Sequence, residues 1–382
     1  MTTHKYPLFK VHVPVQEATD RISAVLSSGF INEGVEVTQL TDALKKQLQA
    51  ENLILVNSCT SALTLALHLI GVGERDDVIS TPMTCVATNT PIVNSGAMIS
   101  WADVDPNHGM VTPETINDAW TMASKAVMVV AWAGTPPDLE GIRRVCDEHG
   151  LAFILDAAHA FGATYQGKPI HEWADYTCYS FQAIKHFTTG DGGALVCRNN
   201  ADYQRSKALK WFGLDRDRAK DDKGNWKGQQ WDVDISEAGY KFNMNNVAAA
   251  IGLSQLPYVD GIIDNHVSHA RQYDREFSKF EAVRPNPRVP GAGSSHWVYA
   301  MKIDPLRSRL NRDELLIALN GEGIMAGVVH VPNDDYTCFS RFVTDLPGVR
   351  EFSANQFSLP CGWWLSPDDI TQIAKRVKEL TA

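Results

Sequence analysis

The sequence predicts an α/β fold, in which a large domain with a doubly wound, mostly parallel sheet is followed by a smaller α+β domain. Between about residues 50 and 200, short β-branched apolar runs alternate with amphipathic segments. Such alternation is typical of a parallel sheet with helices on both faces. A Pro/Gly-rich segment, 284–293, precedes a further strand and two more helices. We therefore predict a large domain over residues 1–255, including an N-terminal arm, and a small domain over residues 256–382.

Seven strands are expected in the large domain, each from one apolar run: Leu53–Asn57, Val78–Thr81, Met98–Val104, Ala126–Ala133, Ala152–Asp156, Tyr176–Phe181 and Ala194–Arg198. Two helices between them should begin at Thr112-Pro113 and Thr135-Pro136, because each pair offers an N-cap followed by a proline at the first helical position. The charged segment Asp215–Asp234 predicts a long exposed loop.

The remaining elements follow this loop. Apolar periodicity predicts helices over Asn246–Leu256 and Val259–Glu281, and then a strand over Trp297–Ile303. A helix should begin after Asn311, with Glu314 three residues on as in a capping box. A last helix should begin at Ser366-Pro367, with Asp369 at the third position.

Composition excludes several classes of protein. Of 382 residues, 44% are hydrophobic and 21% charged, which is ordinary for a globular chain and unlike a disordered or coiled-coil one. The net charge is −10 with no basic stripe, so we expect no nucleic-acid partner. No apolar run approaches the ~18 residues of a membrane span, so no membrane partner is expected either. Seven irregularly spaced cysteines without a CxxC pair predict reduced thiols in a cytoplasmic protein and no metal site.

The segment Tyr179–Arg198 carries the first candidate for chemistry. Lys185 lies in an apolar, uncharged neighbourhood before a glycine-rich turn, 190–193. Burial there would lower the pKa of the lysine and favour the neutral amine, which is the form that makes a Schiff base. An ordinary surface lysine beside a tight turn would show the same pattern.

The segment 151–163 is an apolar strand that ends at Asp156, with His159 three residues later. Strand-end carboxylates of open α/β sheets face the crevice where ligands bind. An acid there can pair with the protonated ring nitrogen of pyridoxal phosphate (PLP). The alternatives are an N-cap aspartate and a core histidine with satisfied hydrogen bonds.

A third segment, 53–70, runs from a strand through the letters NSCTS into an apolar helix. Backbone amides at a helix N-terminus, together with the hydroxyl of Thr60, suit a phosphate group. The same letters would also make an ordinary N-cap.

Taken together, the segments resemble the DegT/StrS-type sugar aminotransferases, which are fold type I PLP enzymes. The shared motifs are the S-x-T helix start at 58–60, DAAH at 156–159 and SFQAIKHFTTGDGG at 180–193. The resemblance continues through GYKFNMNNVAAAIGLSQL at 239–256 and SLPCGWWLSPDD at 358–369, and it includes the opening at 27–48. It therefore covers nearly the whole chain.

The resemblance implies a role for each matching residue. Lys185 corresponds to the lysine that binds PLP and moves the proton, and Asp156 to the acid that pairs with the ring nitrogen. His159 corresponds to the residue beside the ring hydroxyl. The remaining cofactor-binding candidates are Thr60 and Ser180, as hydroxyls on the phosphate, the Cys59 amide beside them, Cys85 at the position of a ring-stacking aromatic, and Asn243, which would reach the neighbouring subunit's site. Cys59 replaces the usual glycine of the S-G-T motif, and Cys85 the usual aromatic residue.

The resemblance also implies the reaction. We expect a PLP-dependent aminotransferase that moves an amino group from L-glutamate to a keto sugar, and in particular to a nucleotide-linked 4-keto-6-deoxyhexose. A site completed by two chains implies a homodimer. The alternatives are a PLP-dependent sugar dehydratase, in which a histidine replaces the lysine, and a non-catalytic binding or regulatory protein on the same scaffold. The presence of both Lys185 and Asp156 argues against these two.

Overall fold

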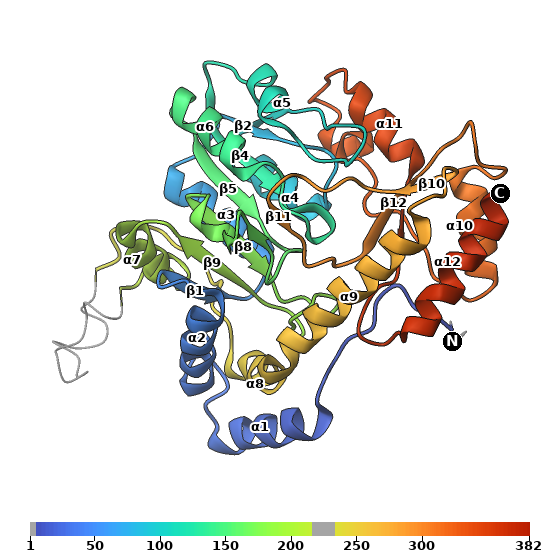
Figure 1. Ribbon diagram of the computed structural model, residues 1–382. Coiled ribbons are helices and arrows are strands. Elements are labelled where there is room, and N and C mark those ends of the chain that lie inside the picture. The colour runs from blue at the N-terminus through green and yellow to red at the C-terminus, as the bar shows by residue number, and fades with distance from the viewer. Residues whose placement is uncertain (1–4, 216–233) are drawn as a thin grey trace.

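The computed structural model describes residues 5–215 and 234–382. Its centre is a seven-stranded sheet of order β1-β9-β8-β5-β4-β2-β3 (Figure 1). Strand β9 runs antiparallel to its neighbours β1 and β8, and the other neighbouring pairs are parallel. All seven predicted strands are present, with these bounds: β1 Leu53–Val56, β2 Asp77–Ser80, β3 Met98–Trp101, β4 Ser124–Val130, β5 Ala152–Asp156, β8 Tyr176–Ser180 and β9 Gly193–Cys197.

Helices cover this sheet. Helix α3 (Cys59–Ile70) packs against β5, β8 and β9, while α2 (Val35–Leu48) and α7 (Asn200–Leu209) pack against β1, and α6 (Leu139–His149) against β5. Helices α4 (Val86–Asn94) and α5 (Pro113–Asp118) contact β3 and α6, respectively. Strands β8 and β9 are buried at every position, as expected when both faces of a sheet are covered.

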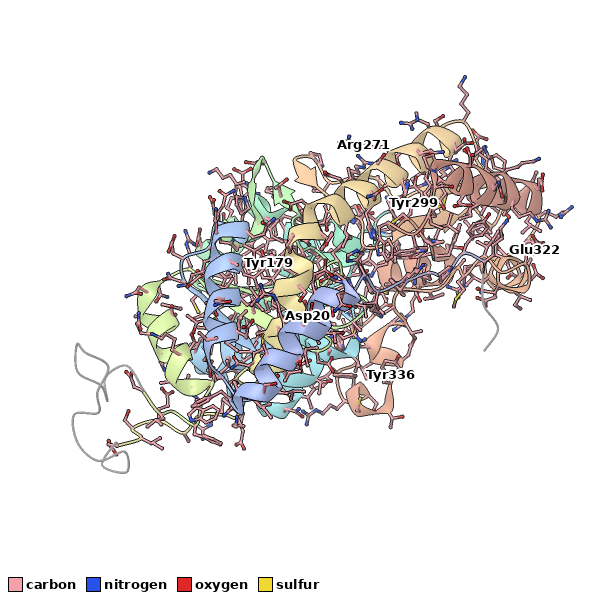
Figure 2. The ribbon with its side chains drawn as sticks, turned by 90° about the horizontal axis from the view of Figure 1, so that it is seen from below. Asp20, Tyr179, Arg271, Tyr299, Glu322 and Tyr336 are labelled. Atoms are coloured by element: carbon pink, nitrogen blue, oxygen red, sulfur yellow. The ribbon has the colours of Figure 1, made fainter. Side chains whose placement is uncertain are left out.

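A second, antiparallel sheet has its own apolar core. It has the order β10-β12-β13 and packs with α9, α10 and α12. Helix α9 runs from the large sheet to this smaller one (Figure 1), and Figure 2 shows Glu322 near one end of the molecule, with Tyr299 between it and Tyr179. The bounds are α9 Val259–Phe277, β10 Val283–Pro285, β12 Tyr299–Ile303, α10 Arg312–Gly321, β13 Gln356–Leu359 and α12 Pro367–Thr381; α11 (Pro347–Asn355) and a short sheet of β6 (Thr164–Tyr165), β7 (Lys168–Pro169) and β11 (Ala292–Gly293) complete the fold.

The N-terminal arm lies on α8 (Asn246–Gln255), where α1 (Val15–Ser28) and α2 both contact it. The Asn246 side chain links α8 to α2 and to the connection before it, because its Oδ1 accepts from the Val37 amide at 3.2 Å and its Nδ2 donates to the Phe30 carbonyl at 2.8 Å. This packing orders the residues between α1 and α2 beside the large sheet.

Most predicted helix starts are confirmed, and one is wrong. Capping boxes open α5, α10 and α12 at Thr112, Asn311 and Ser366. The start predicted at Thr135-Pro136 is wrong, because α6 begins three residues later, where the Asp138 carboxylate accepts from the Gly141 amide at 3.0 Å. The carboxylate is the stronger cap because it bears the charge that a helix N-terminus favours.

Strand ends in the large sheet differ from the prediction by up to three residues, and three element ends after the predicted loop differ as well. Helix α8 ends at Gln255 and α9 at Phe277, and β12 begins at Tyr299, two residues after its predicted start. The division of the chain after residue 255 stays a prediction, and buried apolar side chains between Val329 and Phe352 belong to the core of the large sheet. The predicted loop Asp215–Asp234 lies, except for its two end residues, outside the described residues.

No helix within 5–215 or 234–382 is long and apolar enough to cross a membrane. In the same ranges, no group of three or more His, Cys, Asp or Glu side chains is arranged to hold a metal ion.

Candidate active site

The carboxyl ends of the parallel strands bring the predicted residues to one edge of the large sheet, as open α/β sheets do for ligand sites. Asp156 ends β5, Ser180 ends β8, and α3 starts three residues after the end of β1. Gly193 lies between them, paired with Val56 on one side and with Ser180 on the other. A Cβ on Gly193 would lie 2.6 Å from the Cys59 amide nitrogen. Only glycine therefore allows the start of α3 to approach the sheet this closely.

Asp156 is a buried carboxylate with three donors around it. Its Oδ2 accepts from Thr88 Oγ1 at 2.7 Å, and its Oδ1 accepts from the Ala158 amide at 3.0 Å and from Cys59 Sγ at 3.8 Å. Burial raises the pKa of Asp156, while the bonds from Thr88 and Ala158 oppose the rise. A carboxylate desolvated in this way gains most from a cationic partner, and the protonated ring nitrogen of PLP is such a partner.

Lys185 lies on the turn that follows β8. This turn is closed at its base, because the Phe181 amide donates to the Gly192 carbonyl at 2.9 Å and the Thr189 amide to the Phe181 carbonyl at 3.0 Å. Burial lowers the pKa of Lys185 to about 8, and the nearby Asp156 opposes the change. At pH 7 about a tenth of the amine is then uncharged, roughly 300-fold more than at the ordinary value of 10.5. The amine is therefore suited to act as a nucleophile.

His159 is buried and stacks on the Trp297 indole, with ring centroids 4.0 Å apart. Its Nδ1 makes no hydrogen bond to any residue in the described part of the chain. Burial holds the pKa of His159 well below its usual range, and the ammonium of Lys185 adds to the effect, so the ring is neutral. A buried nitrogen without a partner is costly, and a hydroxyl on a bound ring would satisfy it.

Two hydroxyls accompany the start of α3. Ser58 caps the helix by accepting from the Ser61 amide at 3.1 Å, and Thr60 lies in the first turn. Ser180 is 8% exposed, and its Oγ accepts from the Gln182 amide at 3.3 Å. A helix of this length attracts a phosphate to its first amides.

The residues present fit PLP. The N-terminus of α3 suits the phosphate, the buried Asp156 the ring nitrogen, the unpartnered Nδ1 of His159 the ring hydroxyl, and the Lys185 amine the aldehyde. The electrostatic influence of Asp156 reaches Lys185, so the acid and the amine, 29 positions apart in the sequence, share one site.

The other two predicted residues lie at the margin of this site. Cys85 immediately precedes α4, and it is near enough to Lys185 to affect the pKa of the amine. Asn243 is bridged to Val56 at the end of β1. Its Nδ2 donates to Asn32 Oδ1 at 3.1 Å, and its Oδ1 accepts from the Lys241 ammonium. Its reach into a neighbouring subunit stays a prediction.

Sequence reasoning missed three residues of the site. Thr88 donates to Asp156, Trp297 lies under the Lys185 amine, and His330 stacks near His159 with ring centroids 5.5 Å apart. Burial lowers the pKa of His330 to about 4. The hydroxyl of Thr88, one helical turn after Cys85, was the only local signal; the other two residues come from distant segments.

Comparison with known proteins gives consistent matches. A family model for the DegT/DnrJ/EryC1/StrS aminotransferase family matches residues 14–378. The chain is 29% identical over 375 residues to the spore coat polysaccharide biosynthesis protein SpsC of Bacillus subtilis, covering 96% of this chain and 94% of that one. Two solved structures are also similar. AtS13 from Actinomadura melliaura is 34% identical with a TM-score of 0.90, covering 99% of this chain and 100% of its own. The sugar aminotransferase CalS13 from Micromonospora echinospora is 33% identical with a TM-score of 0.89, covering 98% and 99%.

Proposed function

Because this chain belongs to the DegT/DnrJ/EryC1/StrS aminotransferase family and is a PLP-dependent aminotransferase, we propose that it moves an amino group from L-glutamate to a keto sugar. The expected acceptor is a nucleotide-linked 4-keto-6-deoxyhexose. The sugar class is supported by the 33% identity to a protein described as a sugar aminotransferase. The observation that carries the reaction type is the presence of the Lys185 amine and the buried Asp156 carboxylate in one site, close enough for the acid to influence the pKa of the amine.

The proposed roles divide between binding and proton transfer. When bound, PLP supplies the electron sink for the electrons released at the donor's α-carbon. Asp156, fixed by Thr88 and the Ala158 amide, would keep a proton on the ring nitrogen. Thr60 and Ser180, with the first amides of α3, would bind the phosphate.

Lys185 would act at the reacting atoms. Its lowered pKa provides neutral amine near physiological pH, and a neutral Nζ can accept the proton that leaves the α-carbon of the amino donor. His159 would remain neutral throughout and orient the ring through Nδ1. Because both residues are largely shielded from water, the proton is retained for return to the product.

The experiment is a pair of half-reactions followed by absorbance. Purified protein with PLP should convert to the pyridoxamine form on addition of L-glutamate alone, with release of one equivalent of 2-oxoglutarate. A 4-keto-6-deoxy sugar nucleotide should then restore the PLP spectrum and appear as an amino sugar by mass spectrometry. Lys185→Ala should not turn over, whereas the exposed lysine variant Lys168→Ala should match the wild type.

Each failure has its own meaning. If glutamate leaves the spectrum unchanged while another amino acid converts it, the proposed donor is wrong. If the pyridoxamine form is made but no keto-sugar nucleotide reacts, the proposed acceptor is wrong. Loss of water from the sugar without amination would support the dehydratase instead.

We also propose a homodimer. Apolar side chains of the α1–α2 connection are open to solvent, with Phe30 77% and Ile31 48% exposed. The same connection holds Asn243 through Asn32, so a second copy seated on this surface would lie beside the candidate site. Sedimentation velocity should show a dimer that Phe30→Glu weakens, while Met122→Glu, at a side chain 90% exposed elsewhere, should not. A monomeric wild type would refute the proposal. The cytoplasmic location stays a prediction from the cysteine content.

A further inference from the structure

The Lys185 amine rests on an aromatic side chain from a distant part of the chain. Its Nζ lies 3.6 Å from the centre of the Trp297 ring. Trp297 is 3% exposed, and its Nε1 donates to the Ile184 carbonyl at 2.8 Å. The indole is therefore bonded to the residue that immediately precedes the lysine, and the ring and the amine are held in one local unit.

Trp297 has little freedom to move. Phe9, from the N-terminal segment, stacks on it with ring centroids 4.7 Å apart, and His159 stacks on it at 4.0 Å. Its backbone amide donates to the Ala133 carbonyl at 2.9 Å. Contacts from three separate segments thus fix the plane of the indole beside the sheet edge.

The charges around Lys185 explain why such a contact matters. Asp156, Cys85 and Cys59 favour the ammonium form, whereas burial opposes it more strongly. The two nearby histidines, His159 and His330, are kept neutral by burial. A cation over an aromatic face is stabilised without a formal charge nearby. Trp297 therefore supports the ammonium where full solvation is lost.

We propose that Trp297 is a positioning residue for amino transfer, whose indole face holds the Lys185 amine beside the cofactor site whenever that amine is not bonded to the cofactor. The proposal rests on the proposed function, because an aminotransferase must release and recapture its lysine in every cycle. A lysine side chain has four flexible carbons, and a free one would spread over many rotamers. The Trp297 indole keeps the Lys185 Nζ within reach of the atoms that exchange the proton.

The test uses cofactor-free protein, so it does not depend on the donor or the acceptor. The rate of acetylation of Lys185 by acetic anhydride, measured against pH by peptide mass spectrometry, gives the pKa of its amine. Trp297→Leu should lower this pKa by about 0.4 to 1.5, the range expected for a lost cation–π contact. Trp297→Phe, which keeps an aromatic face, should restore most of the difference.

Controls separate this effect from general loosening. Trp173 lies under Lys168 at 5.8 Å, and Trp173→Leu should leave the pKa of Lys185 unchanged. If Trp297→Leu does not fold, Trp297→Met provides a second apolar replacement without an aromatic face. An unchanged or raised pKa in the non-aromatic variants, or an equal change in Trp173→Leu, would overturn the proposal.

A second measurement, the kinetics of the glutamate half-reaction, links the Trp297 indole to the reaction. In the PLP-loaded enzyme, Trp297→Leu should lower kcat for the glutamate half-reaction at least tenfold, with KM for glutamate changed less than threefold, and Trp297→Phe should recover kcat. A change confined to KM would contradict a role in holding the lysine. Failure of the wild type with glutamate would refute the proposed donor and leave the acetylation result intact.

Discussion

Removing the hydroxyl of Thr88 should make the stability of the protein more dependent on pH. Thr88 Oγ1 donates to Asp156 Oδ2 at 2.7 Å in a buried setting. A hydrogen bond to a charged group contributes about 1.5–3 kcal/mol, so its loss in Thr88→Val should raise the pKa of Asp156 further.

The sign follows from linkage. The pKa of Asp156 is already raised by burial above its value in the unfolded chain. The folded state therefore holds this proton more tightly, and stability is lost as pH rises from the unfolded pKa, about 4, through the folded pKa. A higher folded pKa enlarges that loss. Relative to wild type, Thr88→Val should thus lose about 1.5–3 kcal/mol more at pH 8 than at pH 4.

The assay is urea denaturation of the cofactor-free protein at both pH values. Thr90→Val is the matched control, because Thr90 lies on the same helix and its hydroxyl donates to the Val86 carbonyl in an exposed position. An equal loss for Thr88→Val at pH 4 and pH 8 would refute the assignment of Thr88 as the group that stabilises the ionised acid.

Two other variants test residues outside the reacting groups, Gly193 at the start of β9 and His266 in α9. Gly193→Ala would place a Cβ 2.6 Å from the Cys59 amide nitrogen, so we expect PLP affinity, measured by absorbance titration, to fall at least tenfold. The control Gly73→Ala, where a Cβ meets nothing within 4 Å, should bind PLP normally. Equal affinities of the two variants would show that the start of α3 does not bind the phosphate. Burial lowers the pKa of His266 to about 4, so its stabilising effect is complete above pH 6.5 and is lost as pH falls from 6.5 to about 4, by about 1.4 kcal/mol per pH unit. His266→Gln should flatten the stability curve in that window, and an unchanged slope in urea denaturation would contradict this.

The large sheet was predictable because its strands are buried on both faces. Such strands read as continuous apolar runs, and β4, β5 and β8 could be found without any partner in view. Helix α1 carries a weaker signal. Among its residues only Ala18 and Val25 are buried, and two buried positions give little periodicity.

The site was predictable only in part. Lys185 and Asp156 lie in local patterns that a reader of the sequence can recognise, and both reach the same sheet edge. Thr88 and Trp297 are identified only by their partners. Thr88 bonds to a residue 68 positions away, and Trp297 bonds to one 113 positions away. Sequence spacing carries no information about contacts of that range, which the tertiary fold creates.

The aromatic stack around Trp297 joins segments that lie far apart in the sequence. Phe9 precedes Trp297 by almost 300 positions and His330 follows it by about 30, yet both have ring contacts with it. A nascent chain can therefore build most of the large sheet long before this pocket exists. Binding of PLP would therefore follow synthesis of the segment that contains Trp297 and His330. A chain that stops before these residues would lack the aromatic contacts around the Lys185 amine.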